Sequence, residues 1–281
     1  MNRCLRVIAA IVFIPLLLSA CATYGRIANH PATDRSSANA YSIHQAVLSK
    51  RSNNITLIVA FSGGGTRAAA LAYGVLQGLR DTVVPMDGHA VRLLDEIDVI
   101  SAVSGGSFTA AYFGLHGDGI FNGFENDFLR RDISGHLLDG LLSPSLWFSS
   151  RGRTEMAINV YEDTLFKGAT FADLKRRNGP LIIINATDLA RGVRFSFLQD
   201  YFDLLCSDLS SFPVSRAVAA SSAVPVIFNP VVLKNHNCCR SSAKGMLQKA
   251  RHQAADSPQL LHVIDGLSSY AAKDRRRYIH L

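Results

Sequence analysis

The chain has 281 residues, of which 48% are hydrophobic and 18% are charged, and its formal net charge is +7. This apolar content is enough for one sizeable buried core, and the sparse charge excludes an intrinsically disordered protein. The mild excess of positive charge is compatible with binding to an anionic membrane surface. No basic stripe interleaved with aromatic residues is present, so we expect no nucleic-acid partner.

The first twenty residues have the layout of an export signal. Two basic residues, Arg3 and Arg6, precede an apolar run over residues 7–18, and small residues follow that run. A basic start, a short apolar run and small residues at the cleavage site are typical of a signal peptide. The run is too short for a confident transmembrane helix.

The segment "LSAC" at the end of this signal resembles the lipobox of bacterial lipoproteins. The resemblance implies that residues 1–20 are removed and that Cys21 becomes the acylated first residue of the mature protein. Ala22 in the next position implies an outer-membrane address in the cell envelope. Residues 21–50 are small and polar, so we expect a tether between the lipid and one domain over residues 51–281. An ordinary secretory signal or an uncleaved anchor would explain the pattern without acylation.

Three cysteines remain beyond this signal: Cys206, Cys238 and Cys239. One disulfide is possible, from Cys206 to one member of the adjacent pair, which leaves one thiol over. No second pair of ligands lies at zinc-finger spacing from "NHNCCR", so structural cysteines explain the pattern better than a metal site.

Apolar runs and helical patterns alternate along the rest of the chain. We expect strands over residues 54–61, 96–103, 179–188 and 260–266, and helices over residues 68–81, 107–117 and 215–224. Strands that alternate with helices indicate an α/β domain with a mostly parallel central sheet flanked by helices.

The section from Phe121 to Asn178 is mostly helical in pattern. It contains a leucine cluster and then "SPSLWF", which brings Trp147 and Phe148 together. Because apolar clusters more often belong to a core, we expect a helical cover over the sheet. A lid or a membrane-contacting flap is the alternative, since Trp and Phe favour membrane interfaces. The late basic run, residues 273–277, is expected to be a solvated tail.

Ser104 stands at an abrupt change of pattern, between the expected strand over residues 96–103 and the helix that follows. A sharp strand-turn-helix exposes a serine hydroxyl and directs the positive end of the helix toward developing negative charge. The local pattern, Ala102-Val103-Ser104-Gly105-Gly106, matches G-x-S-x-G except at Ala102. Ser104 is therefore a candidate nucleophile.

A run of three glycines, Gly63, Gly64 and Gly65, lies between the first expected strand and its helix. Consecutive glycines let backbone N–H groups turn toward one point and let a ligand approach closely. No Gly-Lys-Ser/Thr follows, so a phosphate loop is excluded, and Ala68 replaces the last glycine of G-x-G-x-x-G. An oxyanion hole for a nearby serine nucleophile fits the pattern best.

A serine nucleophile needs a base to accept its proton. None of the histidines downstream of Ser104 lies in a recognisable motif. Asp265, in "HVIDG", is better placed, because the carboxyl end of a parallel strand would open on the same edge as the serine turn. A turn aspartate at the end of a strand is the structural alternative.

Three blocks resemble the patatin-like phospholipase family, whose members are lipid acyl hydrolases with a Ser–Asp dyad. "FSGGGTRAAALAYGVL" resembles the glycine-rich block of that family, "SAVSGGSFTAAYFG" its nucleophile turn, and "RAVAASSAVPVIFNPV" a further block. "NATDLARGVRFSF" is similar to the family as well. The resemblance covers most of the chain beyond the tether.

The resemblance implies a patatin-like α/β fold with Ser104 as nucleophile and Asp265 as base. It also implies an oxyanion hole built from Gly63, Gly64 and Gly65, with Arg67 supporting that loop. Phospholipid or another acyl ester is the implied substrate, and the scheme requires no cofactor or metal.

The sequence departs from the family pattern after Asp265-Gly266. Leu267 is bulky where a small residue is expected, and no Asp-Asn pair follows. We therefore expect a truncated or altered C-terminus, and a catalytically impaired lipid-binding scaffold remains an alternative. A conventional Ser-His-Asp esterase that uses His262 or His280 is a further alternative.

Overall fold

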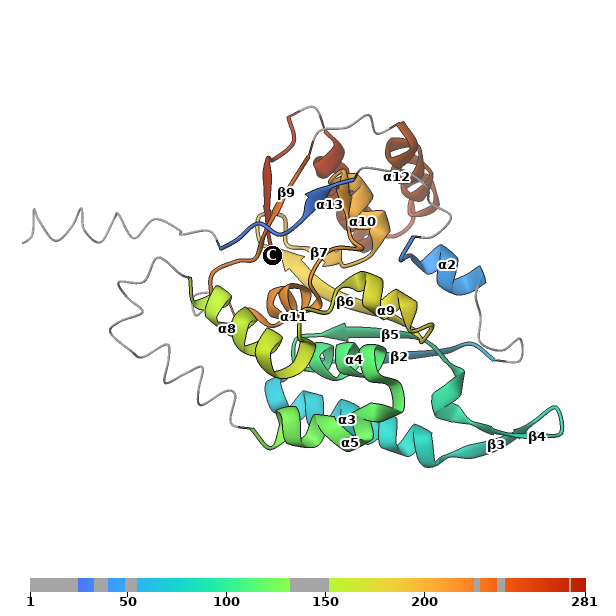
Figure 1. Ribbon diagram of the computed structural model, residues 1–281. Helices are drawn as coiled ribbons and strands as arrows, with labels where there is room; N and C mark the ends of the chain where they lie inside the picture. Colours follow the sequence, from blue (N-terminus) through green and yellow to red (C-terminus); the bar gives the residue numbers. More distant parts are fainter. Residues whose placement is uncertain are drawn as a thin grey trace, which may run out of the picture.

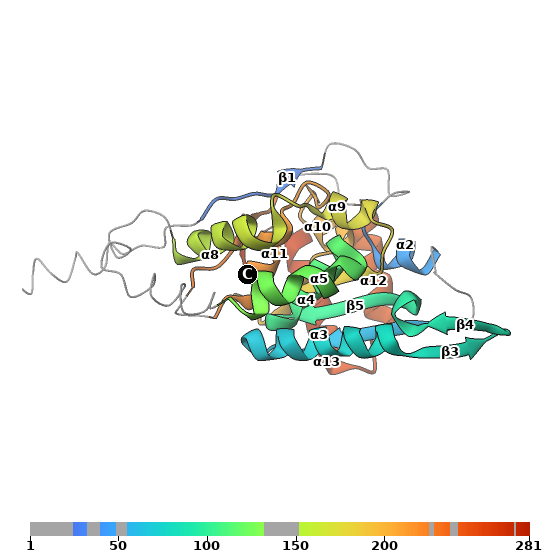
Figure 2. The same ribbon diagram turned by 60° about the horizontal axis from the view of Figure 1, so that its bottom comes forward.

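The computed structural model describes residues 25–32, 40–48, 55–131, 152–224, 228–236, 241–272 and 274–281 (Figures 1 and 2). At its centre is a four-stranded sheet in the order β2-β5-β6-β7. Its strands are β2 (Leu57–Phe61), β5 (Ile97–Val103), β6 (Leu181–Asp188) and β7 (Val193–Ser196). The first three are parallel and β7 is antiparallel to β6. The expected α/β fold, with a mostly parallel sheet flanked by helices, is confirmed.

Helices follow the strands as the sequence pattern indicates. Strand β2 is followed by α3 (Gly65–Asp81), β5 by α4 (Gly105–His116), and α11 (Val214–Ser222) lies further along the chain. Helix α4 lies against the sheet (Figure 1), and an added Cβ at Gly114 would be 2.5 Å from Ile182 Cγ1. The backbone of α4 can approach the sheet closely because this position has no side chain.

The two faces of β2 and β5 are buried to different extents. Ile100 and Ala102 point to one face and are fully buried. On the opposite face Ile58 is 63% exposed and Val103 is 45% exposed. The strand expected over residues 54–61 is therefore confirmed as a strand, but it is not buried on both faces as a central parallel strand would be.

Three small antiparallel pairs surround the main sheet. Their strands are β1 (His30–Pro31) with β8 (Ser207–Asp208), β3 (Val83–Met86) with β4 (His89–Arg92), and β9 (Val232–Lys234) with β10 (Tyr278–His280). The β3–β4 hairpin extends away from the body of the domain (Figure 2).

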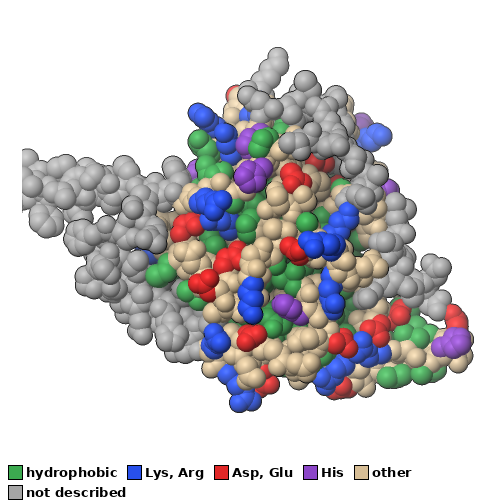
Figure 3. All heavy atoms as spheres, viewed as in Figure 1, with side chains coloured by type: hydrophobic (Ala, Val, Ile, Leu, Met, Phe, Trp, Pro, Cys, Tyr) green, Lys and Arg blue, Asp and Glu red, His purple; other side chains and the backbone are tan. Residues whose placement is uncertain are grey.

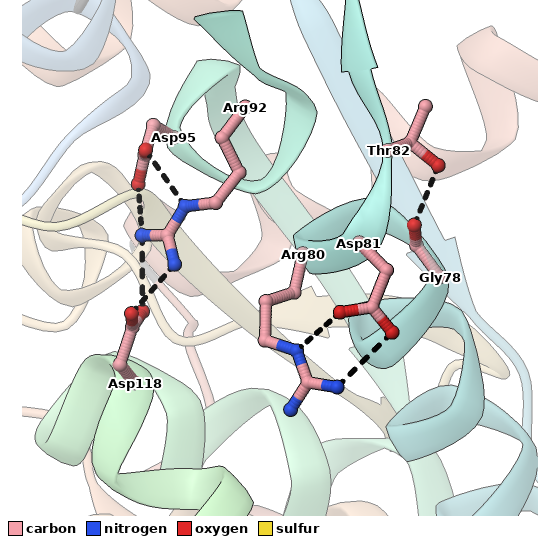
Figure 4. Close-up of polar contacts among 7 residues, drawn as sticks. All are labelled: Gly78, Arg80, Asp81, Thr82, Arg92, Asp95 and Asp118. Carbon is pink, nitrogen blue, oxygen red and sulfur yellow. Dashed lines mark hydrogen bonds and ion pairs between the residues drawn. The ribbon is translucent and has the colours of Figure 1, made fainter.

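Figure 4 shows the ion pairs at the base of this hairpin. The Arg92 guanidinium binds both oxygens of Asp95, at 2.8 and 2.6 Å, and reaches Asp118 beyond the end of α4 at 2.6 Å. Arg80 binds Asp81 in the same bidentate manner, with Nε 2.7 Å from the carboxylate. Such exposed pairs contribute little free energy, but the contact between Arg92 and Asp118 connects the end of the hairpin to the segment after α4.

The remaining helices cover the sheet or lie at its ends. The α-helices are α2 (Ile43–Leu48), α5 (Ile120–Phe124), α8 (Arg153–Tyr161), α9 (Phe171–Arg176), α10 (Gln199–Leu204), α12 (Ser241–Gln253) and α13 (Pro258–Ser268). Single turns of 3-10 or π geometry span Leu93–Glu96, Gly117–Gly119, Glu125–Leu129, Glu162–Phe166 and Ser269–Ala271. The helical pattern expected over residues 121–178 is confirmed where it is described, whereas Trp147 and Phe148 lie outside the described residues.

The strand expected over residues 260–266 is wrong, because this segment belongs to helix α13. Ser257 caps the helix by accepting a hydrogen bond from the Leu260 amide, and Pro258 occupies its first turn, where a missing N–H costs nothing. Leu261, Ile264 and Leu267 recur every three residues and pack on the core. The β-branched residues of "HVIDG" suggested a strand, but the cap and this spacing determine a helix.

The polar tether expected over residues 21–50 is partly folded into the domain. Glu155 accepts a hydrogen bond from the Arg26 amide and forms a buried ion pair with Arg216 at 2.6 Å. Asn29 binds Ser207 and the backbone of Lys234. Residues 25–31 are therefore part of the folded body, and β1 pairs with β8.

Basic and acidic side chains are interspersed on the face that Figure 3 shows, without a large area of one sign. In the part of the chain with described structure, no helix is both long and apolar enough to cross a membrane.

Candidate active site

Two loops leave the sheet side by side at its carboxyl edge. Phe61, the last residue of β2, is the neighbour of Ala102 near the end of β5. The loop after β2 contains the three glycines, and the turn after β5 contains Ser104. Parallel pairing of the two strands therefore brings the two candidate motifs together.

The serine turn has the backbone of a nucleophile elbow. Ser104 has a φ of 53° and a ψ of −124°, and helix α4 begins at the next residue. A positive φ is unfavourable for a residue with a Cβ and persists only where the surroundings impose it. The serine side chain is thereby turned out of the backbone surface, and Ser104 is partly exposed.

The two loops are in contact because neither has bulky side chains. A Cβ added at Gly63 would lie 3.1 Å from Ser104 Cβ and 3.7 Å from Ser104 Oγ. A Cβ at Gly105 would lie 2.1 Å from the carbonyl oxygen of Gly65, and one at Gly106 would lie 2.8 Å from that of Ser62. Gly63 lies against the serine side chain, and both turn glycines face the glycine-rich loop.

The glycine-rich loop can direct amides toward the serine. Gly64 has a φ of 139° and Gly65 a φ of 63°, and Gly65 begins helix α3. The first amides of a helix have no partner within it, so α3 and α4 both present donors at this edge. The loop is exposed, so a substrate carbonyl can reach it. Arg67 lies in the first turn of α3 and is also exposed.

Ser221, near the end of α11, is a further residue of the site for which no local sequence pattern predicts a role. Its hydroxyl accepts a hydrogen bond from the Ser104 amide at 2.8 Å and donates one to the carbonyl oxygen of Asn185 at 2.6 Å. Ser107 Oγ lies 2.9 Å from the same hydroxyl. Ser221 lies in "ASSAVP", which belongs to one of the blocks that resemble the family. Only the tertiary fold shows that this segment contacts the serine turn.

Asp265 does not lie at the end of a strand, where the sequence analysis placed it. It is on α13, half exposed, and its carboxylate pairs with Arg251 Nη1 at 2.5 Å. The neighbouring Gly266 packs against Val193, at the start of β7. Val193 lies two strands away from β5 and three residues beyond the row that contains Val103, so strand spacing separates them by about 14 Å. The described contacts therefore do not bring Asp265 to Ser104, and its role as base stays a prediction.

A different aspartate is anchored at the carboxyl edge of the sheet. Asp188, fully buried at the end of β6, accepts hydrogen bonds from Tyr270 Oη at 2.9 Å and from Arg276. Burial alone would raise the pKa of Asp188, but the hydrogen bonds from Arg276, Tyr270 and the Ala190 amide lower it below its ordinary value. Arg276 belongs to the run over residues 273–277 that was expected to be a solvated tail. That expectation is wrong, because an ion pair attaches Arg276 to Asp188 at the end of β6.

The predictions for acylation and for a disulfide concern the cysteines. Cys21 lies outside the described residues, as do Cys238 and Cys239. Cys206 is disulfide-bonded. Among the described residues, no group of three or more His, Cys, Asp or Glu side chains is placed to hold a metal ion.

The contact between the two loops predicts opposite effects for two glycine substitutions. Gly105→Ala would force a methyl group against the backbone of Gly65, which cannot rotate away, so we expect a loss of about 1–3 kcal/mol or more in the free energy of unfolding. Gly74, within α3, has no atom within 4 Å of an added Cβ. Gly74→Ala is the matched control and should gain up to about 1 kcal/mol. Urea unfolding followed by circular dichroism measures both, and equal stability of the two variants would contradict the packing described.

Comparison with known proteins places these motifs in a family. The family model described as Patatin-like phospholipase matches residues 59–250, which is more than half of the chain. A search of curated protein sequences finds no match. One similar solved structure is human GIVD cytosolic phospholipase A2 in complex with a methyl gamma-linolenyl fluorophosphonate inhibitor, at 14% identity and a TM-score of 0.40. The alignment covers 92% of this chain and 42% of that one, so this chain spans less than half of its length. On the extent of the family match, the chain belongs to the patatin-like phospholipase family.

Proposed function

We propose that this protein hydrolyses acyl esters of lipids, of the phospholipase A type or a related class, with Ser104 as the nucleophile. Membership of the patatin-like phospholipase family supports lipid acyl hydrolysis in general terms. The observation that carries the finer proposal is the position of Gly63 against the Ser104 side chain, at the point where α3 and α4 begin. A nucleophile and a set of amide donors thus meet at one exposed edge.

The proposed reaction has two steps. In the first, Ser104 Oγ attacks the ester carbonyl carbon while its proton passes to a base, and the carbonyl oxygen becomes an oxyanion beside the amides of Gly63, Gly64 and Gly65. Collapse of this intermediate breaks the ester bond, and the alcohol leaves with the proton. In the second, water attacks the acyl-enzyme, releases the fatty acid and restores the serine. Removing one donor from such a hole typically costs about 10²–10³ in turnover.

Asp265 is our proposal for the base, on the resemblance of "HVIDG" to the family motif. To act, its carboxylate would have to leave Arg251 and approach Ser104, which requires α13 to shift relative to β7. His280 is the competing candidate. Its backbone oxygen accepts a hydrogen bond from the Leu189 amide directly beyond β6, at the same edge as Ser104. Burial, and then the charge of Arg276, lower the pKa of His280, which favours the neutral imidazole that a base must have.

A catalytically impaired lipid-binding scaffold is the second candidate function. The observation that favours it is the separation of Asp265 from the serine turn, since a serine without a base is a poor nucleophile. Covalent labelling of Ser104 distinguishes the two functions, because only an activated serine reacts quickly with a fluorophosphonate.

We also propose that the protein is exported and anchored to the cell envelope through acylated Cys21, with the outer membrane as its site. The signal-like first twenty residues and the "LSAC" segment support this proposal. The disulfide at Cys206 supports an oxidising compartment, because disulfides seldom persist in the cytosol.

Ser104→Ala should abolish ester hydrolysis and fluorophosphonate labelling, with a loss in turnover of about 10³-fold or more, because the attacking oxygen is removed. The release of fatty acid from phospholipid vesicles and from a short soluble ester measures the activity. Ser210→Ala is the control, since that exposed hydroxyl binds the neighbouring Asp208. Full activity in Ser104→Ala would exclude the nucleophile assignment.

The identity of the base is tested by three substitutions. If Asp265 accepts the proton, Asp265→Asn should lower kcat by about 10²–10⁴-fold, whereas Arg251→Gln, which frees the carboxylate, should keep or raise it. If Asp265 is only the ion-pair partner of Arg251, both variants should remain active. A large loss in His280→Gln, with activity that falls as the pH drops below the ordinary histidine value, would assign the role to His280 instead.

Cys21→Ser should remove the lipid anchor. We expect the wild-type protein from cells to partition into the detergent phase of a Triton X-114 extract and the variant to move to the aqueous phase. Incorporation of radiolabelled palmitate into the wild type alone would agree. Equal partitioning of both proteins into detergent would contradict acylation at Cys21.

A further inference from the structure

Ser104 sits in a strained conformation, and the residues that hold its backbone come from two other segments. Its φ of 53° and ψ of −124° lie outside the backbone regions that residues with a side chain prefer. A conformation of this kind costs on the order of 1–3 kcal/mol and persists only when its surroundings determine it. Hydrogen bonds to the amide and carbonyl of Ser104 are the obvious means.

The Ser221 hydroxyl uses all of its hydrogen-bonding capacity in this site. A serine hydroxyl has one proton to donate and two lone pairs to accept with. Its proton goes to the Asn185 carbonyl, which can only accept, at 2.6 Å. The Ser104 amide can only donate, at 2.8 Å, so Ser221 accepts there. With its proton already engaged, Ser221 must also accept from the Ser107 hydroxyl at 2.9 Å.

The carbonyl of Ser104 is held as well. The Ser107 amide donates to the Ser104 carbonyl oxygen at 2.9 Å. Ser107 is fully buried in the first turn of α4. Both polar backbone groups of Ser104 are thus fixed, the amide by Ser221 directly and the carbonyl by Ser107, which itself binds Ser221.

The hydrogen bonds of Ser221 continue into the central sheet through Asn185. Asn185 lies in β6, directly beside Val103 of β5. Its side-chain amide donates to the Ala102 carbonyl oxygen at 3.1 Å, and its Oδ1 accepts from Ser196 of β7 at 2.7 Å. Ser221 therefore connects the end of α11 to three strands of the sheet and to the serine turn between β5 and α4.

We propose that Ser221 is a positioning residue for the nucleophile. Its hydroxyl holds the backbone of Ser104 so that the serine side chain stays against Gly63 and the glycine-rich loop. Because the Ser104 amide is engaged by Ser221, it is not available to an oxyanion, which leaves that task to the glycine amides. This inference rests on the proposed function in its catalytic part, whereas the hydrogen-bonding part can be measured without any activity.

The test compares Ser221→Ala and Ser221→Thr with Ser222→Ala as the matched control. Ser222 is the next residue of α11, and its hydroxyl binds Val218 within the helix and Tyr161. The readouts are the rate constant of fluorophosphonate labelling, kcat and KM on a soluble short-chain ester, and the melting temperature. We expect Ser221→Ala to slow labelling and kcat by about 10- to 100-fold with KM little changed, because a displacement of about 1 Å can cost that much. Ser221→Thr should restore most of the rate, and Ser222→Ala should keep it.

A second measurement reads the hydrogen bond itself. The Ser104 amide proton should exchange slowly with solvent in the wild type and faster in Ser221→Ala, while amides in the core of the sheet keep their protection. Unchanged exchange, or unchanged labelling in Ser221→Ala, would overturn the proposal, as would an equal slowing in Ser222→Ala. Failure of the wild type to label at all, with the Ser104 amide still protected through Ser221, would instead refute the proposed hydrolase function and leave the backbone restraint standing.

Discussion

The structure depends on the contact between two turns that have almost no side chains. The glycine-rich loop after β2 and the serine turn after β5 approach until added Cβ atoms at Gly105 and Gly106 would overlap backbone oxygens. Such an approach requires glycine at positions 105 and 106, because a Cβ at either position would push the loops apart. Parallel pairing of β2 with β5 provides the alignment, and the missing side chains allow the contact. Ser104, the proposed nucleophile, and its candidate oxyanion donors are neighbours for this reason.

The carboxyl edge of the sheet is also where distant parts of the chain are attached. Ser221 brings the end of α11 to the serine turn, and the buried Asp188 holds Tyr270 and Arg276 beyond the end of β6. Both attachments use a polar group on β6 or next to it, so this strand fixes the surroundings of Ser104 as well as the core. Buried polar groups that are fully hydrogen-bonded in this way specify one arrangement, because the alternatives leave a group unsatisfied.

The proposed base, Asp265, differs from the proposed nucleophile in where it lies. Ser104 and the glycine-rich loop lie within the stretch that matches the family, whereas Asp265 lies beyond it and faces Arg251. An aspartate in a half-exposed ion pair on a helix has an ordinary structural explanation. His280 lies at the same edge of the sheet, on a strand attached to Leu189, four residues beyond the row that contains Asn185 and Val103. The described contacts therefore bring neither candidate to Ser104. The two candidates differ in their chemistry, since a histidine base adds a dependence on pH near neutrality.

Local patterns in the sequence were sufficient for three strands of the main sheet, β2, β5 and β6, and for helices α3, α4 and α11. Strand β6, helix α3 and the turn at Ser104 follow from apolar runs, helical spacing and glycine placement, because those signals act over a few residues. The segment around Asp265 was misread, since β-branched residues outweighed the cap at Ser257 in that prediction. The roles of Ser221, Arg276 and Arg26 came only from the tertiary structure. Arg26 binds Glu155, 129 residues away, Ser221 binds the Ser104 amide, 117 residues away, and Arg276 binds Asp188, 88 residues away. No local pattern encodes a hydrogen bond between segments that only the fold brings together.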